Sequence, residues 1–249
     1  MRFENKIAVV IGGNSGIGLE AAKGFAAEGA KVVITGRNPE TLKAAAAGIP
    51  NCRAEVCDMA DLEALDAFYA DVKVKEGRID ALSVNAGVGG FCPIPAVTPE
   101  FWDSIHNINL RGAFFAAQKA LPLMGKGGSI VFTGSIGAVM GLVGNCTYAA
   151  AKAALRAVAR NMAKELLEQG IRVNLISPGP TETPIINRNP GMTEEDVANL
   201  RAMMTNAVPM KRMGEAYEVA NAILFLASDD ASFITGIDML VDGGSVELR

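Results

Sequence analysis

The chain is poor in the residues that bind transition metals or form disulfide bonds. Its single histidine, His106, has no cysteine or carboxylate at ligand spacing, and we interpret it as an ordinary helix residue. The four cysteines, Cys52, Cys57, Cys92 and Cys146, show no CxxC spacing. We therefore predict no metal site, free thiols and a reducing, cytoplasmic location.

Long apolar runs and an excess of positive charge are also missing. Glycine, proline or a charged residue interrupts every stretch that could span a bilayer, and the first apolar run stops at Gly12, too early for a signal-peptide core. The 23 basic residues face 27 acidic ones, for a net charge of −4. This balance gives no electrostatic reason to expect a nucleic acid or a membrane as partner.

The chain does contain enough apolar residues for a large core, because half of its 249 residues are hydrophobic. Short β-branched runs alternate with helical stretches, two of which begin with a capping residue followed by proline, at Asn38 and Thr98. This alternation predicts an α/β fold: a single Rossmann-type, doubly wound parallel sheet with helices on both faces. We expect its strands at Ile7–Ile11, Lys31–Thr35, Arg53–Cys57, Ala81–Val84, Ser129–Thr133, Arg172–Ile176 and Met239–Val241.

No internal repeat, linker or shift in composition divides residues 1–249, so we expect one domain. The segment 183–214 departs from the alternation, since it carries three prolines and five methionines. Thr193, followed by three acidic residues, marks a capped helix start inside it. An insertion of this kind is typical of a lid over a substrate site, although the methionines would equally well fill a core.

A glycine-rich turn, GGNSGIG at residues 12–18, joins the first strand to the first helix. Glycine permits the sharp turn and lets the backbone approach a pyrophosphate at the positive end of the helix. The spacing is GxxxGxG rather than GxGxxG, and a lone motif of this type could also be a purely structural turn. Its place after the first strand of an alternating chain favours a dinucleotide-binding catalytic domain.

The end of the second strand indicates which dinucleotide is preferred. In the dinucleotide fold an acidic residue here holds the ribose 2′-hydroxyl of NAD, whereas this chain has Gly36 followed by Arg37. A guanidinium pairs well with a 2′-phosphate, and the missing carboxylate removes a repulsion. We therefore predict NADP(H) in preference to NAD(H); the alternative is that Arg37 is a solvated loop residue.

Tyr148 and Lys152 are four residues apart in an alanine-rich helical run, so both project from one face. The ordinary pKa of tyrosine, about 10, is too high for proton transfer at neutral pH. A neighbouring ammonium stabilises the phenolate, and we expect it to lower the pKa of Tyr148 towards the working range.

With these residues the chain resembles the short-chain dehydrogenase/reductase family along its whole length. Ser135 lies 13 residues before Tyr148, and Asn109 lies further upstream. The resemblance includes the glycine turn and three short motifs, which are Asn85-Ala86-Gly87, Pro178-Gly179 and Asp242-Gly243-Gly244. It implies an oxidoreductase that interconverts a carbonyl and an alcohol by hydride transfer.

The resemblance also implies a role for each matching residue. Tyr148 would be the general acid or base, Lys152 would lower its pKa and bind the nicotinamide ribose, and Ser135 would hold the substrate oxygen. Asn109 would seat a water that links Lys152 to a proton relay. The residues expected to bind the cofactor, besides Tyr148 and Lys152, are Gly12, Asn14, Ser15, Gly16, Ile17, Gly18, Arg37, Asp58, Asn85, Ala86, Gly87, Pro178, Gly179, Thr181 and Thr183.

A substrate pocket is expected beside the catalytic residues, with a mostly apolar wall that favours a small hydrophobic ketone or aldehyde. In this family the helices in segments 109–123 and 148–167, and the C-terminal strand near Asp242, usually build interfaces, which implies a homotetramer. The expected pocket residues are Cys92, Gly137, Val139, Asn145, Cys146, Pro180 and Ile185.

Two other functions are considered. A 3-oxoacyl-(acyl-carrier) reductase would use the same catalytic residues and would need a basic patch beside the cleft, for which Arg188, Lys211 and Arg212 are scattered candidates. A non-catalytic dinucleotide-sensing module would keep the fold without turnover. The presence of Tyr148 and its partners disfavours that second alternative.

Overall fold

The computed structural model describes residues 1–184, 186 and 193–248. Within them, a central sheet of seven strands is parallel throughout, in the order β3-β2-β1-β4-β5-β6-β9. This confirms the predicted Rossmann-type α/β fold. Its strands are β1 (Ile7–Ile11), β2 (Lys31–Gly36), β3 (Cys52–Val56), β4 (Ala81–Val84), β5 (Ser129–Thr133), β6 (Arg172–Pro178) and β9 (Asp238–Val241).

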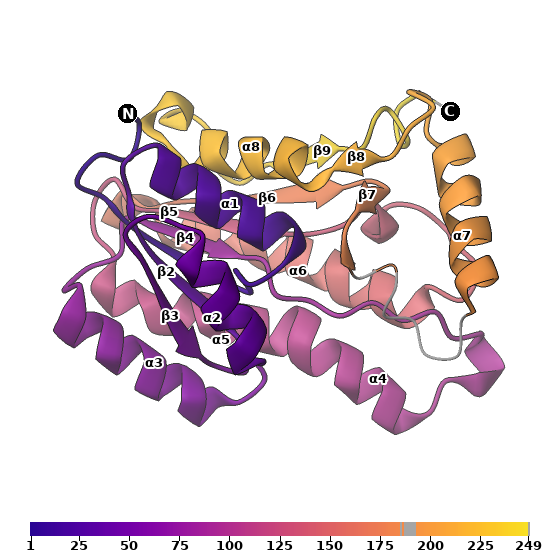
Figure 1. The fold of residues 1–249 in the computed structure, drawn as a ribbon, viewed down its shortest axis with the longest axis horizontal. Coiled ribbons are helices and arrows are strands. Elements are labelled where there is room, and N and C mark those ends of the chain that lie inside the picture. Colours follow the sequence, from indigo (N-terminus) through magenta and orange to yellow (C-terminus); the bar gives the residue numbers. More distant parts are fainter. Residues whose placement is uncertain (185, 187–192, 249) are drawn as a thin grey trace.

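Helices cover both faces of the sheet, as Figure 1 shows. Helices α1, α2 and α8 pack on one face, and α3, α5 and α6 pack on the other. The helices are α1 (Gly16–Ala27), α2 (Pro39–Ala47), α3 (Leu62–Lys75), α4 (Pro99–His106), α5 (Ala113–Ala120), α6 (Cys146–Glu165), α7 (Glu194–Ala207) and α8 (Ala216–Ala227). None of the described helices combines the length and apolarity needed to cross a membrane.

The hydrophobic core consists of two layers, one on each side of the sheet. Phe132 on β5 is fully buried in the layer formed with α3, α5 and α6, and Phe25 on α1 is fully buried in the other. Strands β1, β4 and β5 are buried along their whole length. This explains why they are continuous apolar runs rather than alternating ones.

The order of the strands reverses beside β1, which pairs with β2 on one side and β4 on the other. The connections that leave β1 and β4 therefore run to opposite sides, and a crevice opens at the carboxyl ends of these strands. Local signals fix the helices at this edge: the Asn38 side chain accepts hydrogen bonds from the backbone of Glu40 and Thr41, at 2.9 and 3.0 Å, at the start of α2.

A small second sheet lies at the base of the segment 183–214. Strands β7 (Thr181–Glu182) and β8 (Gly214–Glu215) form a parallel pair that the sequence analysis did not predict. Helix α7 begins at the expected place, with a reciprocal cap between Thr193 and Asp196. In Figure 1 α7 stands at one end of the molecule, away from the sheet.

The methionines of this segment do not form a core. Among those described, Met203 and Met210 are exposed, Met204 is half-buried, and Met213 is buried. Met192 lies outside the described residues.

Candidate active site

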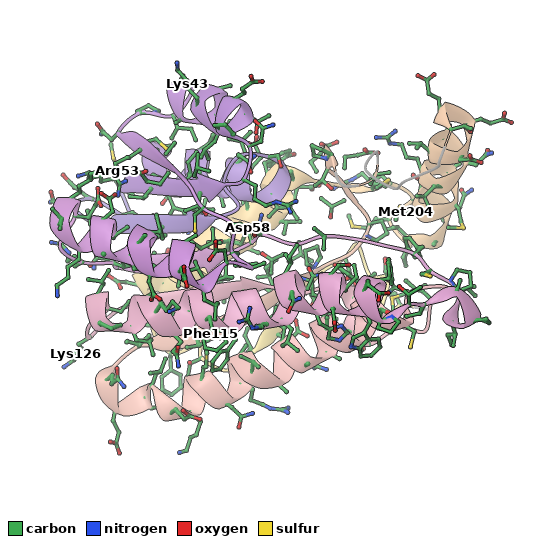
Figure 2. All side chains as sticks on the ribbon, turned by 90° about the horizontal axis from the view of Figure 1, so that it is seen from below. Lys43, Arg53, Asp58, Phe115, Lys126 and Met204 are labelled. Carbon is green, nitrogen blue, oxygen red and sulfur yellow. The ribbon has the colours of Figure 1, made fainter. Side chains whose placement is uncertain are left out.

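One large cavity of about 980 Å³ runs along the carboxyl ends of the strands. Its wall brings together segments that follow β1, β2, β4, β5 and β6, together with part of α7. Asp58, just after β3, and Met204 on α7 both line it, and both are labelled in Figure 2. A cavity of this volume has room for an extended ligand together with a smaller one.

The glycine turn forms a cradle at one side of this cavity. Gly12 has φ 81°, a left-handed conformation that favours glycine, and the amide of Asn85 donates to its carbonyl at 3.2 Å. A Cβ on Gly18 would lie 2.1 Å from the Gly12 oxygen, so the first turn of α1 packs directly on the loop. The positive end of α1 and the bare backbone fit a pyrophosphate.

Gly18 contributes by this packing and is not part of the cavity wall. The other residues expected to bind the cofactor all line the cavity; they are Gly12, Asn14, Ser15, Gly16, Ile17, Arg37, Asp58, Asn85, Ala86, Gly87, Pro178, Gly179, Thr181 and Thr183, with Tyr148 and Lys152.

Arg37 lies at the far end of the cavity, after β2, with its side chain 60% exposed. Its nearest carboxylate is Asp58, at 4.0 Å, a distance at which an exposed pair contributes little. Asn14 packs under Gly36 and donates to the Thr41 hydroxyl at 2.9 Å. The Arg37 guanidinium therefore retains donors for an anionic group.

Lys152 and Tyr148 lie at the other end, one turn apart on α6. Lys152 is 4% exposed, and burial lowers the pKa of its ammonium from 10.5 to about 8. The ammonium donates to the carbonyl of Thr133 at 2.8 Å and lies 5.8 Å from the centre of the Tyr148 ring. It therefore carries a proton that leaves near pH 8.

The environment of Tyr148 differs from the sequence-based expectation. Burial raises the pKa of its phenol above the ordinary value, and a hydrogen bond with Ser135 opposes that rise. The predicted lowering of this pKa by Lys152 is not seen, because the ammonium is directed to the Thr133 carbonyl instead. The Ser135 hydroxyl accepts a hydrogen bond from the backbone of Gly137 at 3.1 Å, which orients it towards Tyr148.

Asn109 is fully buried in a π-helical segment, Asn107–Gly112, between α4 and α5. Its amide donates to the carbonyls of Val88 and Ile105, at 2.9 and 3.1 Å, and accepts from the backbone of Val88 at 3.2 Å. A Cβ on Gly87 would lie 2.9 Å from the Asn109 oxygen and 3.6 Å from the Lys152 nitrogen. The four residues expected to be catalytic therefore share one end of the cavity.

The expected substrate pocket is corrected in part. Gly137, Asn145 and Pro180 line the cavity, but Cys92, Val139 and Cys146 do not. Cys146 is exposed to solvent although its neighbour Asn145 lines the cavity. Successive residues at the start of a helix point in directions about 100° apart, so only one of the two can face the cavity. Val139 is 43% exposed beyond the short helix that follows Ser135, and Ile185 lies outside the described residues.

The sequence analysis missed several apolar residues of the wall. They come from three separate loops and from α7, and no periodic pattern connects them: Val88, Phe91, Leu142, Ile186, Leu200 and Met204. The exposed fractions of Phe91 and Leu142, 51% and 45%, are high for large apolar side chains. No group of three or more potential metal ligands is present among the described residues.

Comparisons with known proteins agree with this geometry. The family model described as enoyl-(acyl carrier protein) reductase matches residues 11–246. The chain is 41% identical over 250 residues to the protein named Oxidoreductase asL5 of Sarocladium schorii, covering 99% of this chain and 98% of that one. It is 37% identical over 252 residues to a 3-oxoacyl-(acyl-carrier-protein) reductase of Thermotoga maritima, covering 99% and 100%. A crystal structure of levodione reductase matches with a TM-score of 0.90 at 33% identity, covering 98% of both chains.

The fold and the site together define a nicotinamide-dependent oxidoreductase that interconverts a carbonyl and an alcohol. The chain belongs to the short-chain dehydrogenase/reductase family, as its motifs indicated.

Proposed function

We propose that the protein reduces a small hydrophobic ketone or aldehyde with NADPH, or runs the reverse oxidation. The observation that carries this proposal is that Arg37 and Tyr148 both line one large cavity. When bound, the nicotinamide dinucleotide supplies or accepts the hydride. The remaining steps belong to residues of this chain.

The catalytic roles follow from the positions of the side chains. Ser135 binds the carbonyl oxygen and holds it near Tyr148, whose phenol gives a proton to that oxygen in reduction and takes it back in oxidation. Lys152 is buried with its pKa lowered to about 8, so it can exchange a proton close to physiological pH and pass protons onward. Asn109 is a positioning residue that fixes the loop after β4 through Val88.

The preference for NADPH rests on Arg37. The guanidinium lies in the cavity wall where a 2′-phosphate would end, and Gly36 leaves no carboxylate to repel it. The test compares kcat/KM for NADPH and NADH in the wild type, Arg37→Leu and Lys43→Leu. Lys43 is exposed on the outer side of α2 (Figure 2) and does not line the cavity.

We expect Arg37→Leu to lower kcat/KM for NADPH at least tenfold, because charge-assisted hydrogen bonds worth about 1.5–3 kcal/mol are lost. The value of kcat/KM for NADH should stay nearly unchanged. Lys43→Leu should leave both values within about twofold. A wild type that prefers NADH, or equal losses in the two leucine variants, would contradict the role of Arg37.

The hydrophobic character of the substrate rests on the apolar wall opposite Tyr148, and we propose that the segment 183–214 acts as a lid there. Leu200 and Met204 on α7 face the cavity, and Arg201 on the same helix pairs with Glu182 of β7 at 3.2 Å. A panel of hydrophobic ketones, aldehydes, keto sugars and acyl thioesters tests the substrate class. Rapid turnover of a keto sugar, together with no turnover of simple ketones, would refute the proposed hydrophobic substrate class.

A 3-oxoacyl-(acyl-carrier) reductase stays the second candidate, favoured by the 37% identity to the Thermotoga maritima protein. The basic patch that it would need has little support among the described residues. Both terminal nitrogens of Arg212 pair with Glu218 at 2.7 Å, and Lys211 donates to the Asn206 carbonyl. Arg188 lies outside the described residues.

We further propose a homotetramer built through the segments 109–123 and 148–167 and the C-terminal strand. Phe233, which precedes β9, is completely exposed, and Ile237 is 39% exposed. Large apolar side chains exposed beside an edge strand are typical of an interface. Sedimentation equilibrium tests this assembly, and a monomer would refute it. The cytoplasmic location stays a prediction from the cysteine content.

A further inference from the structure

Thr133, the last residue of β5, takes part in the site with its side chain as well as its backbone. The residue is 8% exposed and lines the cavity. Its carbonyl accepts the hydrogen bond from the Lys152 ammonium at 2.8 Å, and its hydroxyl donates to the side-chain oxygen of Asn85 at 3.2 Å. One residue therefore contacts both the lysine of the site and the loop that follows β4.

The Asn85 amide is held between two partners. Its oxygen accepts from the Thr133 hydroxyl, and its nitrogen donates to the Gly12 carbonyl at 3.2 Å. Turning the amide over would place its oxygen against the Gly12 oxygen, and two acceptors cannot bond to each other. The amide therefore has one favourable orientation, and in that orientation its oxygen is paired with the Thr133 hydroxyl.

The Gly12 carbonyl connects this amide to the glycine turn and to the start of α1. A Cβ on Gly18 would lie 2.1 Å from the Gly12 oxygen and 2.6 Å from the Asn85 side-chain nitrogen. The first turn of α1 thus packs against both members of this hydrogen bond. Because groups this closely packed leave no free space, a shift of the Asn85 amide would move the turn that fits the pyrophosphate.

On the side of β4, the Thr133 hydroxyl acts where backbone pairing has ended. The last paired residues of β4 and β5 are Val84 and Phe132. Asn85 and Thr133 follow them directly, so their side-chain hydrogen bond joins the two strand ends beyond the ladder. This bond holds the end of β5 in place, and with it the carbonyl that binds the Lys152 ammonium.

We propose that Thr133 is a positioning residue whose hydroxyl couples the dinucleotide-binding turn to Lys152. Without the hydroxyl, the Asn85 amide loses one of its two partners, and both Gly12 and the carbonyl at position 133 are held less firmly. Dinucleotide binding and proton transfer through Lys152 then both weaken. This inference rests on the proposed function, since it takes Lys152 as the group that passes protons onward.

The test separates the hydroxyl from the rest of the side chain. Thr133→Val removes the hydroxyl and keeps the branched shape, whereas Thr133→Ser keeps the hydroxyl and removes the methyl group. The control is Ser83→Ala, because Ser83 on β4 is fully buried, does not line the cavity, and has a hydroxyl without a hydrogen-bond partner among the described residues. Fluorescence titration gives the dissociation constants of NADPH and NADH, and kcat is measured with the panel compound that the wild type reduces fastest.

We expect Thr133→Val to raise the dissociation constant of the preferred dinucleotide about fivefold and to lower kcat about fivefold, each within the range of one neutral hydrogen bond. Thr133→Ser and Ser83→Ala should keep both values within about twofold of the wild type. A role confined to stability would lower the melting temperature of Thr133→Val and leave both values unchanged at a temperature where all four proteins are folded.

Unchanged values in Thr133→Val, or a change in only one of the two, would overturn the coupling. Equal losses in Thr133→Val and Thr133→Ser would overturn it as well, because the hydroxyl would not be their cause. A wild type that binds a dinucleotide but reduces no carbonyl compound would instead overturn the proposed function and, with it, the part of the inference that concerns Lys152. The dissociation constants of the two Thr133 variants would still decide whether the hydroxyl holds the dinucleotide-binding turn.

Discussion

Burial of the Lys152 ammonium, which the proposed mechanism uses, destabilises the folded protein, and this destabilisation can be measured. Its ammonium is buried, and the pKa falls from 10.5 in the unfolded chain to about 8 in the native protein. At pH 7 both states carry the proton, and the native state holds a charge that water would solvate better. The difference between the two pKa values corresponds to about 3 kcal/mol of lost stability at pH 7.

The sign of the pH dependence follows from proton binding. Between pH 8 and 10.5 the unfolded chain binds more protons at Lys152 than the native protein does, so the stability of the wild type rises with pH in this window. At pH 9.5 the destabilisation by Lys152 has fallen to less than half of its value at pH 7. Above 10.5 the residue is neutral in both states and contributes no further change.

Lys152→Met removes the charge and keeps the length of the side chain. It also removes the charge-assisted hydrogen bond to the Thr133 carbonyl, which is worth about 2 kcal/mol. We therefore expect the variant to be inactive and yet more stable than the wild type by about 1 kcal/mol at pH 7, with this advantage gone at pH 9.5.

Urea unfolding at both pH values, at matched protein concentrations, measures this gap. Lys164→Met is the control, because Lys164 is an exposed residue near the end of the same helix. The reasoning fails if Lys152→Met is less stable than the wild type at pH 7, or if the gap is the same at both pH values.

Three further predictions concern the site and the core. Tyr148→Phe should lower kcat by about 10²–10⁴-fold and keep dinucleotide affinity, measured by turnover and fluorescence titration; a fully active variant would refute its proton-transfer role. Gly18→Ala should abolish dinucleotide binding, because its Cβ meets the Gly12 oxygen at 2.1 Å, whereas Gly141→Ala, with no atom within 4 Å, should bind normally. Phe132→Ala should lower the free energy of unfolding by about 3–5 kcal/mol in urea titrations, since its ring is fully buried; a loss under about 1 kcal/mol would contradict the core described.

Much of the fold could be predicted because strands and caps carry local signals. Three of the expected strands, including Ile7–Ile11, have the predicted bounds, and the others differ by one or two residues. Proline after a capping residue marked the starts of α2 and α4. The pair β7–β8 could not be predicted, because a two-residue strand has no periodicity and depends on a partner far along the chain.

The grouping of Asn109, Ser135, Tyr148 and Lys152 in one cavity was predictable from motifs, but the residues around them were not. We predicted both Asn145 and Cys146 in the cavity wall, and only Asn145 lies there. Which of two neighbouring residues faces the cavity depends on where α6 begins, and the sequence does not give that position to within one residue. The direction of the Lys152 ammonium depends on the Thr133 carbonyl, a backbone group that no pattern of side chains reveals. Apolar wall residues such as Phe91 come from irregular loops, where spacing carries no directional information.

The π-helical segment around Asn109 has a consequence for how this chain can change in length. A π-helix holds one residue more than the α-helix that would span the same stretch, so it is a natural place for an insertion during evolution. Losing one residue there would let α4 and α5 join into one helix with regular α-helical hydrogen bonds, and the helix itself would become more stable. The same deletion would rotate everything on one side of it by about 100°, taking Asn109 away from Val88 and from the loop that it fixes. We therefore expect a one-residue deletion in this segment to cost more activity than stability.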